Sequence, residues 1–185
     1  MQHKGTVVLE TERLILRPFT EDDAQAVFVG WASDSEVTKY LTWPTHRTVN
    51  DSLGFMRYCV QSYQDKTSYQ WGMERRDTHE LIGNISVVHI NEDIAEMGLG
   101  WVLSRNYWGQ GYMPEAAKRV IGFLFDEVAV NRIFATHDAR NLKSGRVMQK
   151  VGMKYEGTLR QSTRNNQGIV DLSHYAILRS DRETL

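Results

Sequence analysis

The chain has few of the residues that cross-link or segment a protein. Cys59 is the single cysteine in 185 residues, so no internal disulfide can form, and only three prolines are present. We find no repeat, no low-complexity tract and no linker rich in Pro, Gly or Ser, so one domain over residues 1–185 is expected. A core of this size buries roughly 70% of the unfolded surface without a disulfide or metal. The neighbours of Cys59 (Met56, Val60 and Tyr63) favour a buried helical position over a nucleophilic one.

An excess of one charge and long apolar runs are missing as well. There are 22 Lys and Arg against 23 Asp and Glu, which gives a net charge of −1. Nucleic acids and anionic membranes bind concentrated basic faces, so neither is expected as a partner. No run approaches the roughly 18 apolar residues of a membrane span, and the first residues lack the apolar core of a secretory signal. We therefore expect a cytoplasmic protein, with a homodimer left open.

Hydrophobic periodicity predicts a mixed α/β protein. Alternating apolar residues indicate strands at 7–18, 69–73, 81–90, 95–103 and 132–136, and two more around a turn at 165–168. Helical spacing indicates helices that begin at Thr20, Thr48 and about residue 112, and a fourth from Leu142 to Val151. The helix after residue 112 is expected to cross between two parallel strands. These elements form a mixed, mostly antiparallel seven-stranded sheet with helices on both faces.

The stretch from Trp101 to Ala117 carries the clearest chemical signal. A strand runs into a turn with two glycines, Gly109 and Gly111, and the turn runs into a helix. Pro114 fits the first helical position, which would make Met113 an N-cap that lacks a side-chain acceptor. The free amides of such a helix end favour an anion, and a diphosphate is the natural ligand. A tight turn whose amides meet solvent fits the same residues, so both interpretations stay open at this point.

Blocks along most of the chain match one family pattern. They are Thr11–Pro18, Asp22–Ala24, Trp108–Tyr112 with Glu115–Ala116, Asn141–Ser144, Lys150–Met153 and Tyr155–Gly157. Together these blocks resemble the GNAT superfamily of N-acetyltransferases, and most closely its branch of ribosomal-protein-alanine N-acetyltransferases (RimJ/RimL type). The resemblance covers about residues 9–180. It implies the GNAT acyl-CoA N-acyltransferase fold and transfer of an acetyl group from acetyl-CoA to a primary amine, with CoA as product and no metal.

The resemblance also assigns the residues that would bind acetyl-CoA. The backbone of Trp101, Val102 and Leu103 would pair with the pantetheine arm, and the strand from Arg132 would splay away to open a slot. The pyrophosphate would be held by amides of the loop, which are those of Tyr107, Trp108, Gly109, Gln110, Gly111 and Tyr112. Asn141 would hydrogen-bond the pantetheine and Ser144 would lie near the sulfur. The same two residues also suit an N-cap and an ordinary first-turn position of a helix.

Ser144 is the candidate acid for the proton transfers, and Glu96 is the first candidate base. Many GNAT enzymes use a tyrosine as general acid at the position where this chain has Met148. The resemblance to the ribosomal-protein branch instead implies that Ser144 protonates the departing thiolate. Glu96 is the candidate base, because relatives often carry a glutamate two positions later and an i, i+2 displacement keeps the same strand face. A solvated charge on a half-exposed strand is the alternative for Glu96. His89 and His137 are the other candidate bases.

The acceptor pocket is expected between the aromatic loop at residues 40–46 and the late strands. Its candidate residues are Tyr40, Trp43 and Tyr175, although such aromatics also suit a core. A protein or peptide α-amine is the first candidate acceptor, because its pKa of about 7.7–8.0 makes the neutral form accessible. A small amine (a polyamine, an amino acid or an antibiotic) is the second. Thr163 keeps that alternative open, because one group of relatives has a glutamate base there. A CoA-binding sensor without catalysis is the third hypothesis.

Overall fold

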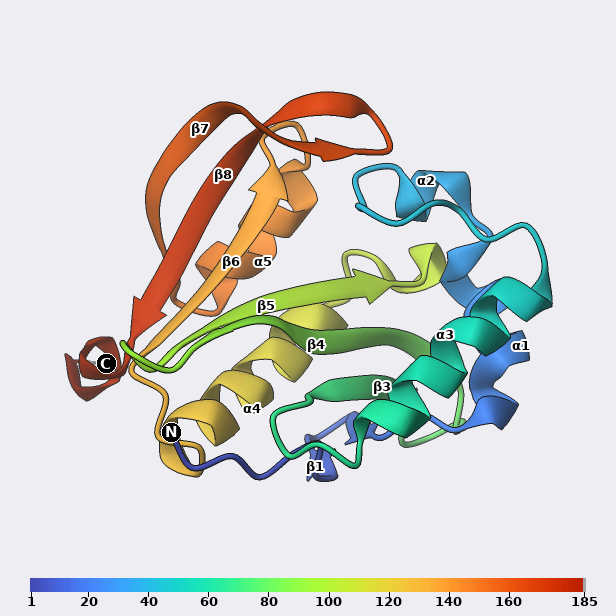
Figure 1. The fold of residues 1–185 in the computed structure, drawn as a ribbon, viewed down its shortest axis with the longest axis horizontal. Coiled ribbons are helices and arrows are strands. Elements are labelled where there is room, and N and C mark those ends of the chain that lie inside the picture. Colours follow the sequence, from blue (N-terminus) through green and yellow to red (C-terminus); the bar gives the residue numbers. More distant parts are fainter. Residues whose placement is uncertain (185) are drawn as a thin grey trace.

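The computed structural model of the chain describes residues 1–184, which form one eight-stranded sheet with helices on both faces (Figure 1). The sheet order is β1-β2-β3-β4-β5-β6-β8-β7. All neighbours pair antiparallel except β5 and β6, which are parallel. The strands are β1 (Leu9–Glu10), β2 (Leu14–Arg17), β3 (Gln70–Arg75), β4 (Leu81–Asn91), β5 (Glu96–Leu103), β6 (Arg132–Asp138), β7 (Lys154–Asn165) and β8 (Gly168–Leu178). The predicted mixed α/β architecture is confirmed.

The eighth strand arises because the predicted first strand is a hairpin. The amide of Thr11 donates to the carbonyl of Leu14 at 2.9 Å, and the amide of Leu14 donates to the Thr11 hydroxyl at 2.9 Å. The chain therefore turns at residues 11–14, and β1 folds back antiparallel on β2 with Leu9 opposite Leu16. The prediction of a single strand over residues 7–18 was wrong for this reason.

Four of the helices begin close to the predicted positions, whereas α2 was not predicted. The helices are α1 (Ala24–Val27), α2 (Ser35–Thr38), α3 (Val49–Ser62), α4 (Tyr112–Asp126) and α5 (Leu142–Lys150), with short 3-10 turns at Glu21–Asp23, Arg105–Tyr107 and Arg179–Thr184 and a π turn at Phe28–Ala32. Capping boxes formed by Thr20 with Asp23, and by Thr48 with Asp51, start the 3-10 turn before α1 and the helix α3. Among the described residues, no helix has both the length and the apolar character needed to cross a bilayer.

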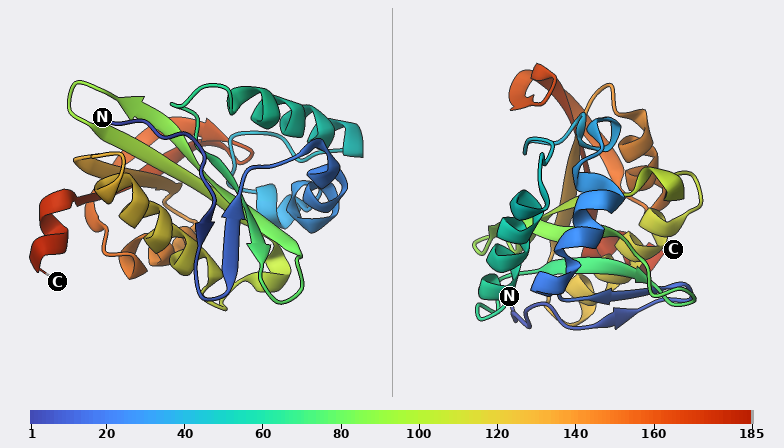
Figure 2. Two further views of the ribbon diagram at one scale, coloured as in Figure 1. Left: turned by 90° about the horizontal axis from the view of Figure 1, so that it is seen from below. Right: turned by 90° about the vertical axis from the view of Figure 1, so that its right-hand side faces the viewer.

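Two hydrophobic cores cover the two faces of the sheet. Figure 2 shows α1 and α3 on one face and α4 and α5 on the other. The larger core packs α4 and α5 against the sheet, and the smaller one packs α1 and α3. Cys59 lies fully buried in the smaller core, and burial raises the pKa of its thiol to about 12, which agrees with the predicted structural role. Val60 is 38% exposed, so the expectation that it shares this buried face was wrong.

The parallel strands β5 and β6 separate halfway along their length. Their pairing runs from Glu96 opposite Arg132 to Leu99 opposite Ala135 and then stops. Beyond that point β5 continues to Leu103 and β6 to Asp138, and the two strands diverge (Figure 1). The helix α4 makes the crossover between them, as the sequence predicted. The divergence leaves the β6-facing edge of residues 100–103 open, which confirms the predicted slot.

Candidate active site

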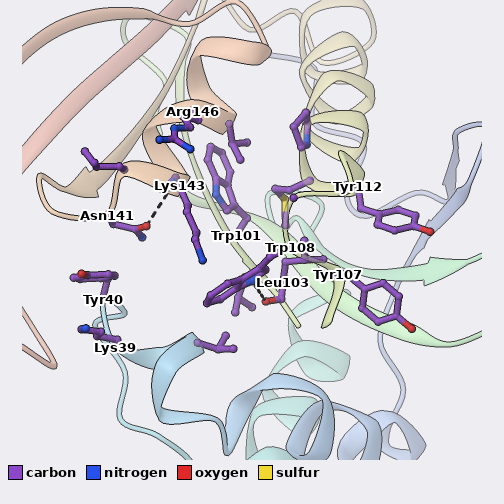
Figure 3. A pocket seen from close by; sticks show the side chains of 18 of the residues that line it. Lys39, Tyr40, Trp101, Leu103, Tyr107, Trp108, Tyr112, Asn141, Lys143 and Arg146 are labelled. Atoms are coloured by element: carbon purple, nitrogen blue, oxygen red, sulfur yellow. Dashed lines mark hydrogen bonds between the residues drawn. The ribbon is translucent and has the colours of Figure 1, made fainter. Parts of the chain in front are cut away.

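The gap between β5 and β6 opens into a cavity of about 770 Å³. Its walls are the end of β5, the loop before α4, the first turns of α5, and α2 with the segment that follows it (Figure 3). Most of the residues predicted from the sequence line this one cavity, and they are Tyr40, Trp101, Val102, Leu103, Tyr107, Trp108, Gly109, Gly111, Tyr112, Asn141 and Ser144. The structure therefore brings together three segments that are far apart in the chain.

The loop before α4 is a cradle of backbone amides. Gly109 and Gly111 have φ values of 78° and 83°, a left-handed conformation that side chains disfavour. Gly111 is the N-cap of α4, so the prediction that Met113 is the N-cap and Pro114 the first helical residue was wrong by two positions. The glycine conformation lets the helix begin earlier, and Pro114 still falls in the first turn, where its missing amide costs no hydrogen bond.

Five successive amides of this loop are available to a ligand. Within residues 1–184, no hydrogen bond is donated by the backbone amides of Gly109, Gln110, Gly111, Tyr112 and Met113. The amides of Tyr107 and Trp108, which were also expected in the cradle, instead donate to the carbonyls of Ser104 and Arg105 at 3.0 and 3.2 Å. The free amides thus span residues 109–113, at the positive end of the α4 dipole, and suit a phosphate group.

Aromatic side chains anchor the loop while its backbone faces the cavity. The rings of Tyr107 and Tyr112 point away from Lys143 and Trp108 (Figure 3). They pack edge to face, with their centroids 5.7 Å apart. The Tyr107 hydroxyl donates to Glu80. The indole nitrogen of Trp108 donates to the carbonyl of Leu103 at 2.8 Å, which ties the loop to the end of β5.

Cations gather at the cavity although the chain is nearly neutral. The charged residues that line it are five cations, Lys39, Arg140, Lys143, Arg146 and Lys150, and one carboxylate, Glu36. The Lys143 ammonium lies 3.9 Å from the centroid of the Trp108 ring, so it spans the gap between α5 and the loop. Positions 143, 146 and 150 share one helical face, which is the sequence signal that could have found part of this cluster. Cations and free amides together fit a ligand with several phosphates.

Asn141 and Ser144 start α5 at the cavity wall. The side-chain oxygen of Asn141 accepts from the Ser144 amide at 3.4 Å, so Asn141 is the N-cap of this helix. Both residues line the cavity. The Ser144 hydroxyl is half-buried and has no hydrogen-bond partner within residues 1–184. Met148, one turn later, is 1% exposed and belongs to the larger core.

Glu96 lies far from the cavity. It starts β5, five residues before Trp101, which corresponds to roughly 17 Å along a strand. Its carboxylate accepts from the Arg132 guanidinium at 2.6 Å and lies 3.8 Å from His89. Neither His89 nor His137 lines the cavity, and His137 is buried with its Nδ1 2.7 Å from the Asp138 carbonyl. The structure therefore brings none of the three sequence-derived base candidates to the cavity.

Three other predicted site residues lie outside the cavity lining. The side chain of Gln110 bends back to the carbonyl of Asn106 at 2.8 Å. Trp43 packs on the smaller core, with its ring 5.3 Å from that of His46. Tyr175 is 9% exposed and belongs to the larger core. For Trp43 and Tyr175 the structure thus favours the core alternative, whereas Tyr40 lines the cavity.

A polar tether that sequence reasoning missed links the end of β6 and the β7–β8 turn to the segment that follows α2. Asp138, at the end of β6, is 4% exposed and accepts from Arg140 Nη2 at 2.7 Å and from Asn165 Nδ2 at 2.9 Å. Burial opposes ionisation, yet the hydrogen bonds from Arg140 and Asn165 lower the pKa of Asp138 to about 2. In the β7–β8 turn, the side chain of Asn166 donates to the carbonyls of Thr38 and Trp43 at 2.9 and 2.8 Å. The β7–β8 turn is therefore bound to the segment that follows α2.

Comparison with known proteins identifies the family. The model of the acetyltransferase (GNAT) domain matches residues 13–154. The uncharacterized N-acetyltransferase YoaA of Bacillus subtilis (strain 168) is 33% identical over 172 residues, which are 93% of this chain and 97% of that protein.

Solved structures share the fold. A GNAT-family acetyltransferase from Bacillus anthracis superposes with a TM-score of 0.83 at 29% identity, covering 94% of this chain and 99% of the other. RimL, a ribosomal L7/L12 α-N-protein acetyltransferase solved with coenzyme A, superposes with a TM-score of 0.83 at 17% identity, covering 93% of this chain and 98% of RimL. With its slot between two parting strands and its amide cradle, the chain belongs to the GNAT acetyltransferase family and is an N-acetyltransferase.

Proposed function

We propose that the chain uses acetyl-CoA to acetylate a primary amine, and that the amine is the α-amine of a protein or peptide. The observation that carries the first part is the cradle of five amides without acceptors, at residues 109–113, beside the open edge of β5. Phosphate oxygens are the acceptors that such a helix terminus favours. The five cations around the cavity add charge of the sign that a diphosphate requires.

Different residues of the chain would bind acetyl-CoA and assist the transfer of its acetyl group. Bound acetyl-CoA supplies an acetyl group activated as a thioester. The edge of β5 at Trp101–Leu103 orients the pantetheine arm through backbone hydrogen bonds, and the loop amides compensate the charge of the diphosphate. The side-chain nitrogen (Nδ2) of Asn141, whose side-chain oxygen caps α5, would donate to the same arm. Ser144 would pass its hydroxyl proton to the sulfur as the C–S bond breaks, and would regain a proton from the nitrogen of the attacking amine as the new C–N bond forms.

The charges of the cavity favour an α-amine as acceptor. Its lining contains a single carboxylate, Glu36, which is exposed. A lysine side chain, with a pKa near 10.4, needs a strong base before it can attack, whereas an α-amine of pKa about 7.7–8.0 is partly neutral near pH 7. Five nearby cations also repel a polyamine or another polycation. RimL, which shares the fold, acts on an α-amine, and this supports the same acceptor class.

The decisive experiment measures acetyl-CoA binding by calorimetry for the wild type and Gly111→Ala. A side chain at φ +83° is strained, so the turn must rearrange and we expect affinity to fall about tenfold. Gly122→Ala is the matched control, because Gly122 lies on the same helix, has no positive φ and leaves its new methyl in open space. Equal affinity of the wild type and Gly111→Ala would refute the cradle assignment.

Release of free CoA with a panel of amines then tests the acceptor. We expect turnover with peptides that carry a free α-amine and little with N-blocked, lysine-containing peptides or polyamines. Preferential turnover of polyamines would overturn the acceptor assignment. Tight acetyl-CoA binding without turnover of any amine would favour a non-catalytic sensor.

A further inference from the structure

Arg13 contacts the amide cradle from behind, although it lies in the β1–β2 turn, far away in the sequence. Its Nη1 donates to the carbonyl of Gln110 at 3.1 Å. Its guanidinium carbon lies 4.2 Å from the centroid of the Tyr112 ring. Its Nε and Nη2 reach one carboxylate oxygen of Glu115, in the first turn of α4, at 2.7 and 2.6 Å. One side chain therefore touches the loop, the helix start and the aromatic ring that anchors them.

The contact with the Gln110 carbonyl fixes the orientation of a peptide group. In a trans peptide the carbonyl and the following N–H point in opposite directions. Because the Gln110 carbonyl points at Arg13, the Gly111 amide points away from Arg13. Gly111 lines the cavity whereas Arg13 does not, so an amide that points away from Arg13 is free to face the cavity. A carbonyl turned the other way would present a negative dipole to an anion.

Glu115 holds Arg13 in place and makes it necessary. The carboxylate also accepts from the Thr11 hydroxyl at 2.6 Å and from the Arg13 amide at 2.9 Å. Burial disfavours its charge, but these hydrogen bonds keep the pKa of Glu115 below its usual value, so it stays ionised. An unpaired carboxylate in the first turn of α4 would repel a phosphate bound there. Arg13 compensates that charge through two hydrogen bonds.

We propose that Arg13 is a positioning residue that turns the Gln110–Gly111 peptide toward the cavity and shields bound phosphate from Glu115. The inference rests on the proposed function, since it assumes a diphosphate at the cradle. Arg13 itself does not line the cavity, and its effect is exerted through the backbone of the loop. A change at Arg13 therefore alters cofactor affinity without removing any group that contacts the acetyl-transfer centre.

The first test compares CoA affinity by calorimetry in the wild type, Arg13→Met and Arg17→Met. Arg17 is a matched control on β2, where it pairs with Asp23 and Glu74 at 2.9 and 2.6 Å, away from the cavity. We expect the Kd for CoA to rise about tenfold in Arg13→Met, as loss of a charge-assisted hydrogen bond implies, and to stay near the wild-type value in Arg17→Met. Arg13→Lys, which keeps the charge without the guanidinium fork, should recover only part of the affinity.

The second test needs no ligand. In amide NMR spectra of the free protein, Arg13→Met should shift the Gly111 resonance more than that of Gly122, whereas Arg17→Met should move neither. Unchanged CoA affinity together with an unmoved Gly111 resonance in Arg13→Met would overturn the inference. If the wild type does not bind CoA, the proposed function fails, and the Gly111 resonance alone still decides whether Arg13 orients the peptide.

Discussion

At the residue scale, Ser144 is the side chain from which the proposed chemistry draws a proton. Its half-buried hydroxyl lines the cavity and has no partner in the described part of the chain. A hydroxyl that only assists the leaving group acts in the transition state and contributes little to ground-state binding. Ser144→Ala should therefore lower kcat by about 10²-fold or more and leave the Kd for acetyl-CoA almost unchanged.

Steady-state release of CoA and calorimetry measure the two quantities separately. Ser62→Ala is a suitable control, because Ser62 belongs to α3, outside the cavity, and its hydroxyl donates to a backbone carbonyl at 2.7 Å. An unchanged kcat in Ser144→Ala would remove this residue from the mechanism.

Single residues also mark the limit of what the sequence can tell. Strand alternation predicts which face of β5 Glu96 occupies, but it does not fix how far along the strand the cavity lies. The partner of Glu96, Arg132, comes from the parallel register of β6, which is a non-local contact. Gly111, in contrast, is identified by its chain neighbours alone, because a glycine pair before a helix is a local signal.

At the scale of elements, local signals predicted the helices well and the first strand poorly. The two capping boxes at Thr20 and Thr48 lie within four residues of the helices they start, so sequence suffices for them. The turn at residues 11–14 was not predicted, because the strands on either side of it are too short to show a clear alternation. The parity of the buried residues changes from odd at Leu9 to even at Leu14 and Leu16, which is a sign of a turn.

Asp138 provides a prediction about the β7–β8 hairpin, which it tethers to the end of β6. Its folded pKa of about 2 lies below the ordinary value of about 3.9, so the stabilisation is complete above pH 4 and is lost as the pH falls toward 2. Asp138→Asn should lower the free energy of unfolding by about 1–2 kcal/mol at pH 7, and the difference from the wild type should shrink between pH 4 and pH 2.

Urea unfolding at pH 7 and at pH 2.5 tests this pH dependence. Asp22→Asn removes an exposed carboxyl of the same type and should change stability little at either pH. A loss in Asp138→Asn that is the same at both pH values would show that packing, and not the charge of the carboxylate, holds the hairpin.

At the scale of the whole molecule, charge location matters more than net charge. The composition gives −1, yet folding brings Lys39 and Arg140 beside Lys143, Arg146 and Lys150 around one cavity. Three of these cations share a helix face and were within reach of pattern analysis. Arg140 precedes α5 by two residues and is also a local neighbour, so Lys39 is the one of the five that joins them through the fold, from the segment after α2.

This charge asymmetry predicts that the affinity for CoA depends on salt and on where in the structure a cation is removed. Arg146→Gln with Lys150→Gln removes two charges from the cavity wall, and Arg57→Gln with Lys66→Gln removes two from outside its lining. Both double variants have the same net charge. At low salt the first pair should raise the Kd for CoA about tenfold and the second should barely change it. At about 0.5 M salt the screening length falls to roughly 4 Å, so the gap should narrow. Calorimetry at both salt concentrations measures the Kd for CoA of each double variant. An equal change of Kd in the two double variants would mean that CoA binding depends on the net charge of the protein and not on the cations at the cavity.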